Sequence, residues 1–295
     1  MYPRPFTYFK PDTVDELLEH LTDDTLGTKV LAGGQSLIPA MKHRFISPRR
    51  VVDITGLREL DYLRKKGNIL EVGALVTTGA LENSDTVTST LPILGAAAST
   101  IGDPLVRNMG TVGGNLCLAD PVNDLPAVML ALEVRMVVAS AAEERRIDAD
   151  KFFIGAFRTR LSPVEVLTGV ELPLRGGRCG GSYKKVRKAS GGFTIAGVAS
   201  QVALGDDNSV TRCGLGLTGV GSRPIRASEA EREVLGKTPE SWEMDEVADM
   251  VVAASNPLSD KRASANYRRR VLRVLTREAL EESYENALHK EVSAV

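Results

Sequence analysis

The sequence predicts a mixed α+β protein built from three units, and two observations lead to this fold class. Apolar segments of strand length alternate with helical segments in residues 1–56, and the same pattern starts again at residue 57. After a glycine-rich run at residues 175–181, three strand-like segments precede three helical ones. Strands and helices in separate blocks are typical of an α+β unit, and 295 residues are enough for two or three units.

In the first unit, residues 1–56, we expect strands at residues 6–9, 28–31 and 51–54. Thr13 is the predicted N-cap of a short amphipathic helix over residues 14–21. The second strand leads into a glycine stretch, Ala32-Gly33-Gly34-Gln35-Ser36-Leu37, and residues 38–42 are expected to open a helix.

In the second unit, residues 57–175, we expect a helical turn within 57–63, a strand at 69–72, and helices starting at 78 and spanning 91–101. A loop over residues 102–108 is expected to lead into a second glycine stretch, residues 110–115. Asp120-Pro121 predicts the start of a helix over 122–132, because proline suits the first helical position. Strands are predicted at 134–139 and 164–172.

The third unit, residues 180–288, is predicted to hold strands at 182–187, 194–204 and 210–220 and helices at 227–235, 239–255 and 263–287. Gly214-x-Gly216-x-x-Gly219 formally matches a dinucleotide-binding fingerprint. Such a loop should pass directly from strand to helix, and here the glycines lie inside a strand-like run. We therefore interpret them as part of a strand.

Composition limits the classes of function. The net charge of −1 gives no general attraction to nucleic acid or anionic membranes, and no apolar stretch approaches the roughly 20 residues that span a bilayer. The start of the chain lacks the apolar segment of a signal peptide, so we expect a cytoplasmic protein. Three scattered cysteines and three scattered histidines predict no metal site and no iron–sulfur cluster in this chain. The basic run at 261–273 is interpreted as a solvated helix face or a subunit contact.

The two glycine stretches are the candidate binding loops. Glycine allows a close approach of the backbone to an anion, and successive amides before a helix can converge on a phosphate. Two such loops suit a diphosphate or a dinucleotide, whereas the alternative is a pair of ordinary turns. Neither stretch ends in Gly-Lys-Ser/Thr, which excludes a P-loop.

Asp124 and Lys185 are further candidates. A carboxylate at position 124, in the first turn of the predicted helix, could accept hydrogen bonds from ligand hydroxyls, or it could only complement the helix dipole. Lys184 and Lys185 must face opposite sides of a strand. The buried lysine could stabilise electron-rich flavin oxygens; the alternative is that both lysines reach solvent.

Taken together, these motifs resemble the FAD-binding medium subunit of the molybdenum hydroxylases, the xanthine dehydrogenase and aerobic carbon monoxide dehydrogenase group. The resemblance covers nearly the whole chain. It rests on Ala32-Gly33-Gly34-Gln35-Ser36-Leu37, Gly73-Ala74 with Thr77-Thr78, Arg107-Asn108, Thr111-Val112-Gly113-Gly114-Asn115, Asp120-Pro121 with Asp124-Leu125-Pro126, Leu167 with Glu171-Leu172-Pro173, Tyr183-x-Lys185, and Ser264-Ala265-x-Tyr267-Arg268-Arg269. Gln35 stands where carbon monoxide dehydrogenases often have histidine, which favours another substrate.

The resemblance implies a two-subdomain FAD-binding fold of the vanillyl-alcohol oxidase or MurB-like (PCMH) type, followed by a C-terminal α+β domain with a three-stranded sheet and helices. It implies that residues 32–36 hold the pyrophosphate, that Asp124 holds cofactor hydroxyls, and that Leu167 and Lys185 flank the isoalloxazine ring. The full implied cofactor-binding set is Ala32, Gly33, Gly34, Gln35, Ser36, Leu37, Thr77, Ile101, Gly110, Thr111, Gly114, Asn115, Asp124, Leu167 and Lys185. No catalytic residue and no metal ligand is expected in this chain.

The implied function is electron transfer through FAD within an oxidoreductase. Molybdenum–pterin on a large subunit and [2Fe–2S] clusters on a small subunit are the implied partners, in a dimer of heterotrimers, that is, a heterohexamer. Two alternatives stay open at this point: a self-sufficient flavin-dependent oxidoreductase of the same fold superfamily, and a non-enzymatic FAD-binding or assembly module.

Overall fold

The structure, a computed structural model, describes residues 2–24, 27–189 and 192–289. Its first unit is a three-stranded parallel sheet with strand order β1-β3-β2. The elements of this unit are β1 (Thr7–Phe9), α1 (Val14–Asp23), β2 (Thr28–Leu31), α2 (Leu37–Lys42) and β3 (Arg50–Asp53). As predicted, Thr13 caps α1 by accepting a hydrogen bond from the Glu16 amide at 3.2 Å. The buried leucines of α1 pack in one cluster with Val52 and Ile54, which fixes the helix on the sheet.

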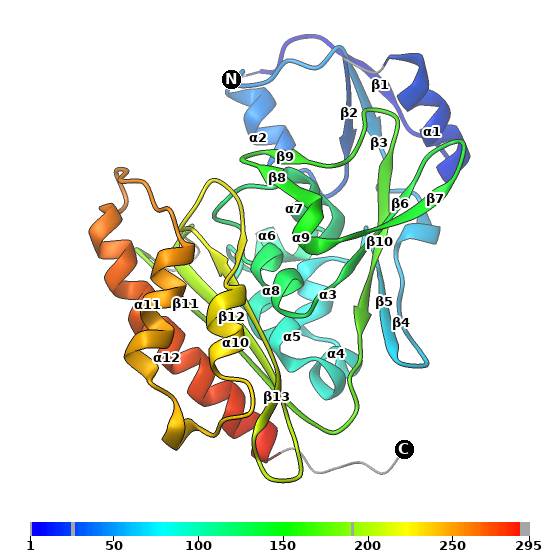
Figure 1. The fold of residues 1–295 in the computed structure, drawn as a ribbon. Helices are drawn as coiled ribbons and strands as arrows, with labels where there is room; N and C mark the ends of the chain where they lie inside the picture. The colour runs from blue at the N-terminus through cyan, green and yellow to red at the C-terminus, as the bar shows by residue number, and fades with distance from the viewer. Residues whose placement is uncertain (1, 25–26, 190–191, 290–295) are drawn as a thin grey trace.

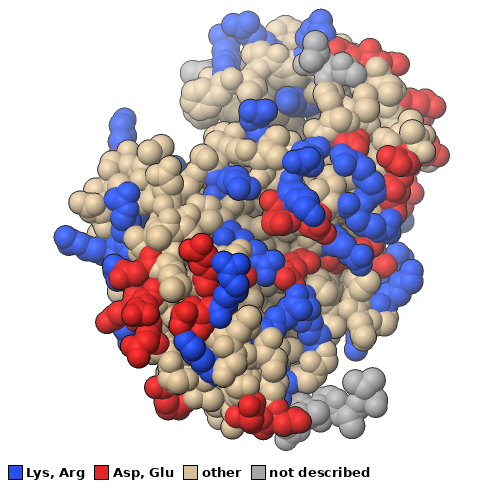
Figure 2. Space-filling view, in the orientation of Figure 1, with Lys and Arg blue, Asp and Glu red and all other residues tan. Residues whose placement is uncertain are grey.

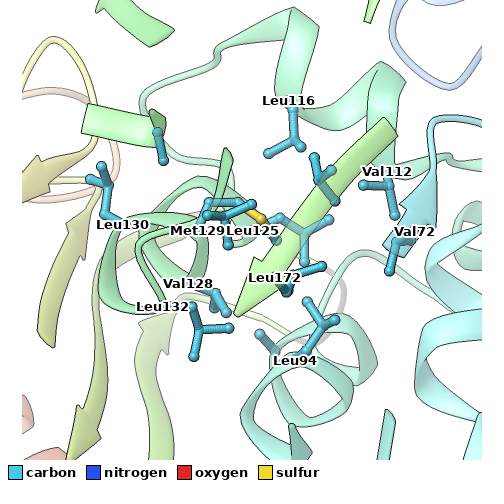
Figure 3. Packing of buried hydrophobic residues seen from close by; sticks show 14 of the residues in the cluster. Val72, Leu94, Val112, Leu116, Leu125, Val128, Met129, Leu130, Leu132 and Leu172 are labelled. Carbon is cyan, nitrogen blue, oxygen red and sulfur yellow. The ribbon is translucent and has the colours of Figure 1, made fainter. Parts of the chain in front are cut away.

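The second unit holds a five-stranded antiparallel sheet with strand order β4-β5-β10-β6-β7. Its strands are β4 (Leu63–Lys66), β5 (Ile69–Gly73), β6 (Arg135–Ala139), β7 (Glu144–Asp148) and β10 (Val166–Pro173), and a small hairpin is formed by β8 (Phe153–Gly155) and β9 (Arg158–Thr159). Its helices are η1 (Arg58–Leu60), α3 (Thr78–Glu82), α4 (Asp85–Thr90), α5 (Pro92–Ser99), α6 (Pro104–Met109), α7 (Val112–Leu118), α8 (Leu125–Ala131) and α9 (Ala149–Phe152). Figure 3 shows side chains of α8 at the centre of the apolar core, with Leu116 of α7, Leu94 of α5 and Leu172 of β10 around them.

Three sequence expectations in this unit were wrong or incomplete. Residues 102–108 are not a loop, because Asp103 caps α6 by accepting a hydrogen bond from the Val106 amide at 2.9 Å. The Asp120-Pro121 pair does not begin a helix; Asp120 instead accepts the Val122 amide at 3.1 Å in a turn, and α8 begins only at Leu125. Strands β4 and β7 and helix α4 were not predicted; the strongly charged sequence of β7 carries no apolar alternation that would mark a strand.

The third unit is an antiparallel sheet with strand order β11-β12-β13-β14, and helices pack on it. The strands are β11 (Arg178–Arg187), β12 (Thr194–Leu204), β13 (Val210–Thr218) and β14 (Ile225–Arg226); the helical elements are α10 (Ser228–Glu233), η2 (Pro239–Ser241), α11 (Met244–Ala254) and α12 (Ala265–Leu288). The three expected strands are present, and the two-residue β14 adds a fourth. The segment expected as one helix at 239–255 is divided into η2 and α11. In Figure 1, α11 and α12 lie on the outer side of this sheet, at the lower left.

Helix α8 packs on the opposite face of the C-terminal sheet, where two glycines of β13 leave room for it. A Cβ at Gly214 would lie 2.1 Å from the Ala131 carbonyl oxygen, and one at Gly216 would lie 1.9 Å from that of Ala127. The glycine motif is thus strand structure, as predicted, and its small residues serve a close contact between the second and third units.

Most of the basic run at 261–273 faces outward, but Arg268 is 3% exposed. Its guanidinium donates hydrogen bonds to the carbonyl oxygens of Ile195 and Gly219 and pairs with Asp260. The prediction of a solvated face or subunit contact is therefore wrong for Arg268, which joins α12 to β12 and the end of β13. Acidic and basic side chains lie intermixed over the face drawn in Figure 2. Among the described helices, none combines the length and the apolar character needed to cross a membrane.

Candidate functional site

The two glycine loops lie against each other. A Cβ on Gly33 would fall 1.8 Å from the Met109 carbonyl oxygen and 3.1 Å from the Cα of Gly110. A Cβ on Gly114 would lie 3.8 Å from the Cβ of Ala32. Residues about 75 positions apart along the chain thus form one continuous backbone surface, and the missing side chain of Gly33 permits the contact.

The first loop keeps its backbone donors free. Among the described residues, no acceptor takes a hydrogen bond from the amides of residues 33–36, although the carbonyl oxygens of Gly34 and Ser36 accept from the following turn of α2. Gly34 has φ +74°, which turns the chain into the helix, and Gln35 and Ser36 are exposed. A run of unpaired amides on an open surface is chemically suited to an anion such as a phosphate.

The second loop is different, because its amides are already used. The amides of residues 112–115 donate to the carbonyl oxygens of Val76, Ala74 and Thr111 and to the Thr111 hydroxyl. The expectation that both loops present converging amides therefore holds for the first loop only. What the second loop offers is the Asn115 side chain, whose Oδ1 is buried and has no hydrogen-bond partner among the described residues.

Asp124 lies directly before α8 rather than in its first turn, and its carboxylate does not cap the helix. Its Oδ1 accepts hydrogen bonds from the hydroxyls of Tyr183 at 2.5 Å and Thr194 at 2.6 Å. Its Oδ2 pairs with Nζ of Lys185 at 2.7 Å, and the side chains of this pair are 7% and 5% exposed. A carboxylate from the second unit is thus held by three residues of the C-terminal sheet.

Burial shapes the titration of this cluster. Burial raises the pKa of the Tyr183 phenol well above its ordinary value, and the negative charge of Asp124 acts in the same direction. Burial lowers the pKa of the Lys185 ammonium, and the attraction of Asp124 opposes that effect. Tyr183 is therefore a neutral hydrogen-bond donor at physiological pH, and Asp124 is the group that favours the charged form of Lys185.

The glycine loops and the Asp124 cluster are joined by hydrogen bonds. Lys185 Nζ donates to the Thr100 carbonyl oxygen at 2.9 Å, and the next carbonyl, that of Ile101, accepts from Arg107 of α6 at 3.2 Å. On the other side, the Asn123 side chain donates to the Asn115 carbonyl oxygen at 2.9 Å. The structure thus brings Ile101, Asp124 and Lys185 into one region with the second loop.

Thr77 and Leu167 occupy supporting positions. Thr77 caps α3 and forms an isolated antiparallel bridge with Thr111, which ties the second loop to β5 and α3. Leu167 lies on β10 opposite Val138, 2% exposed within the central core. Their expected contacts with a cofactor stay predictions.

The two lysines of β11 face opposite sides, as expected. Lys184 pairs with Glu282 of α12, whereas Lys185 is buried against Asp124, so the alternative with both lysines in solvent is wrong. The two hydroxyls on Asp124 were not predicted. Tyr183 could have been found, since it lies two residues before Lys185 and so on the same strand face. Thr194 comes from the neighbouring strand, and no sequence signal marks it.

A family model described as the FAD-binding domain in molybdopterin dehydrogenase matches residues 4–175, and one described as the CO dehydrogenase flavoprotein C-terminal domain matches residues 181–283. The first alone covers more than half of the chain. The chain belongs to the FAD-binding medium subunits of the molybdenum hydroxylases.

Relatives in this family agree over the full length. The chain is 39% identical over 282 residues to the glyceraldehyde dehydrogenase medium chain of Sulfolobus acidocaldarius, covering 96% of this chain and 99% of that one. It is 33% identical over 281 residues to the carbon monoxide dehydrogenase medium chain of Afipia carboxidovorans, covering 95% and 97%. The solved carbon monoxide dehydrogenase of Hydrogenophaga pseudoflava superimposes with a TM-score of 0.93 at 34% identity, covering 97% of this chain and 99% of that chain. The resemblance and fold class predicted from the sequence are confirmed, and the relatives are subunits of multi-subunit oxidoreductases.

Proposed function

We propose that this chain carries FAD as the electron-transfer subunit of a molybdenum hydroxylase, taking electrons from [2Fe–2S] clusters of a small subunit and passing them to an external acceptor. Bound FAD supplies a redox centre that accepts electrons and releases them again, while the protein binds it and tunes it. The observation that carries the proposal is the row of unpaired amides at residues 33–36, which adjoins the second glycine loop.

The polar groups of the site fit this cofactor. We assign the pyrophosphate to the amides of residues 33–36, because converging N–H groups match its negative oxygens. We assign the orphaned Oδ1 of Asn115 to a hydrogen-bond donor of the cofactor, since a buried acceptor without a partner is costly. Thr111, Gly114 and Lys185 are proposed to line the same cofactor, together with the remaining members of the set predicted from sequence. The prediction that Asp124 itself holds cofactor hydroxyls is taken up again below.

The proposed partners are a small [2Fe–2S] subunit and a large molybdopterin subunit, assembled as a dimer of heterotrimers. Two facts support this division of labour: relatives are named medium chains, and the sequence has three cysteines with no Cys-x-x-Cys spacing for a cluster of its own. The domain boundaries at residues 56, 175 and 180 and the cytoplasmic location stay predictions.

The proposal is tested by titrating the flavin-free chain with FAD, FMN and riboflavin while flavin fluorescence is followed. Since FMN has one phosphate and riboflavin has none, we expect FAD to bind most tightly and riboflavin most weakly. Equal affinity for FAD and riboflavin would contradict the role of the first loop, and a chain that binds no flavin would overturn the proposal. Reduction of the bound FAD by a co-purified iron–sulfur partner supports electron transfer, whereas substrate turnover by the isolated chain would favour the self-sufficient alternative.

A further inference from the structure

The buried cluster around Asp124 joins two units of the chain and uses most of its acceptor capacity internally. An ionised carboxylate has about four acceptor positions. Three are taken by the hydroxyls of Tyr183 and Thr194 and by the ammonium of Lys185. Asp124 therefore has little capacity left for the hydroxyls of a ligand.

Lys185, in contrast, has bonding capacity left. An ammonium group has three N–H donors, and two of them go to Asp124 Oδ2 and to the Thr100 carbonyl oxygen. The third has no acceptor among the described residues, although the side chain is only 5% exposed. A buried cation with one unused donor is suited to an electron-rich ligand atom.

Stability alone gives a poor account of this pair. Taking an ammonium and a carboxylate out of water costs several kcal/mol per ion in effective terms, and well-packed apolar residues of similar volume often serve stability as well or better. The neighbouring groups are arranged to keep both charges: the two hydroxyls stabilise the carboxylate, and the Thr100 carbonyl, which also accepts from Arg187 at 3.0 Å, stabilises the ammonium.

We infer that Asp124 is a positioning residue for Lys185 rather than a ligand of the cofactor. Tyr183 and Thr194 fix the carboxylate, the carboxylate fixes the ammonium and keeps it charged, and the third N–H of Lys185 is presented to the flavin. This inference rests on the proposed FAD site. Reduction of a flavin by two electrons with uptake of one proton adds one negative charge, so a fixed cation favours the reduced form. The cluster thus sets the reduction potential of the bound FAD.

The experiment measures the midpoint potential of FAD and its dissociation constant in the full chain. We expect Lys185→Met and Asp124→Asn each to weaken the preference for reduced over oxidised flavin about tenfold or more, and tenfold corresponds to a fall of about 30 mV for a two-electron couple. Tyr183→Phe should lower the potential less, because it leaves the ion pair intact. Lys184→Met is the matched control: it removes the same charge from the adjacent position, on the opposite face of β11, and should leave the potential unchanged.

The double variant separates the two roles of Asp124. If both residues act through one charge, the potential of Asp124→Asn with Lys185→Met equals that of either single variant. If Asp124 binds cofactor hydroxyls directly, Asp124→Asn weakens both redox forms equally, leaves the potential unchanged and adds to the effect of Lys185→Met on affinity, and the inference fails. Should Asp124→Asn not fold, Tyr183→Phe combined with Thr194→Val gives the same comparison. Failure of the proposed function has a different signature, since the unaltered chain would then bind no FAD.

Discussion

Gly33→Ala should separate the two glycine loops and weaken FAD binding. An added Cβ would lie 1.8 Å from the Met109 carbonyl oxygen, whereas real Cβ atoms keep about 3.0 Å, so the loops must part by about 1.2 Å. The atom that it meets is backbone, which cannot rotate away as a side chain could. Overpacking of this kind typically costs about 1–3 kcal/mol, and 1.4 kcal/mol is a factor of ten in an equilibrium constant. If the strain is borne by the bound state, the dissociation constant for FAD should rise about five- to 150-fold.

The assay is titration of the flavin-free variant with FAD, with the melting temperature measured in parallel. Gly155→Ala is the matched control, because a Cβ at Gly155 would meet no atom within 4 Å. We expect this control to bind FAD as the unaltered chain does. A normal FAD affinity for Gly33→Ala would refute the reasoning, since it would mean that the contact between the loops is not needed for the site.

Three further predictions concern stability. Gly216→Ala places a Cβ 1.9 Å from a carbonyl oxygen of α8 and should cost about 1–3 kcal/mol, seen as a drop of several degrees in melting temperature; an unchanged melting temperature would contradict the close packing of β13 on α8. Phe152→Ala, at a side chain that is 0% exposed, should cost about 3–5 kcal/mol in urea unfolding, whereas Phe157→Ala, at 61% exposure, should cost far less. The hydrogen bond from Arg145 holds the pKa of the Glu165 carboxyl below its usual range, so its contribution to stability is complete above the unfolded-state pKa of about 4.3 and is lost as the pH falls through the folded-state value. Glu165→Gln should therefore reduce the loss of melting temperature between neutral and acidic pH, and an identical pH profile would argue against this pair.

Local sequence patterns predicted most of the elements, and the errors have physical causes. The chain contains two Asp-Pro pairs, at residues 103–104 and 120–121, and each has the pattern of a helix start. The first does cap α6. At the second, the Pro121 carbonyl oxygen accepts hydrogen bonds from the amide of Gly219 and the hydroxyl of Thr218, which tie this segment to the end of β13 as a turn. A contact with residues almost 100 positions away decided the outcome, and no local pattern contains it.

The candidate site divides in the same way. Both glycine loops were recognised from residue type, and their contact through Gly33 needs no side chain. Their different chemistry was not predictable, because the amides of the second loop are consumed by carbonyl oxygens of Ala74 and Val76, in a segment that is distant in sequence. Asp124 was identified as a carboxylate near a helix start, but its partners come from β11 and β12.

The sequence by itself determined the family, the fold class and the residue types available to the cofactor site, because glycine loops, strand alternation and the spacing of motifs are local properties of the chain. The tertiary structure decided which of those groups are free. Hydrogen-bond donors and acceptors are distributed by whatever packs against them, so only the folded chain leaves the amides of residues 33–36 open and gives Asp124 to Lys185.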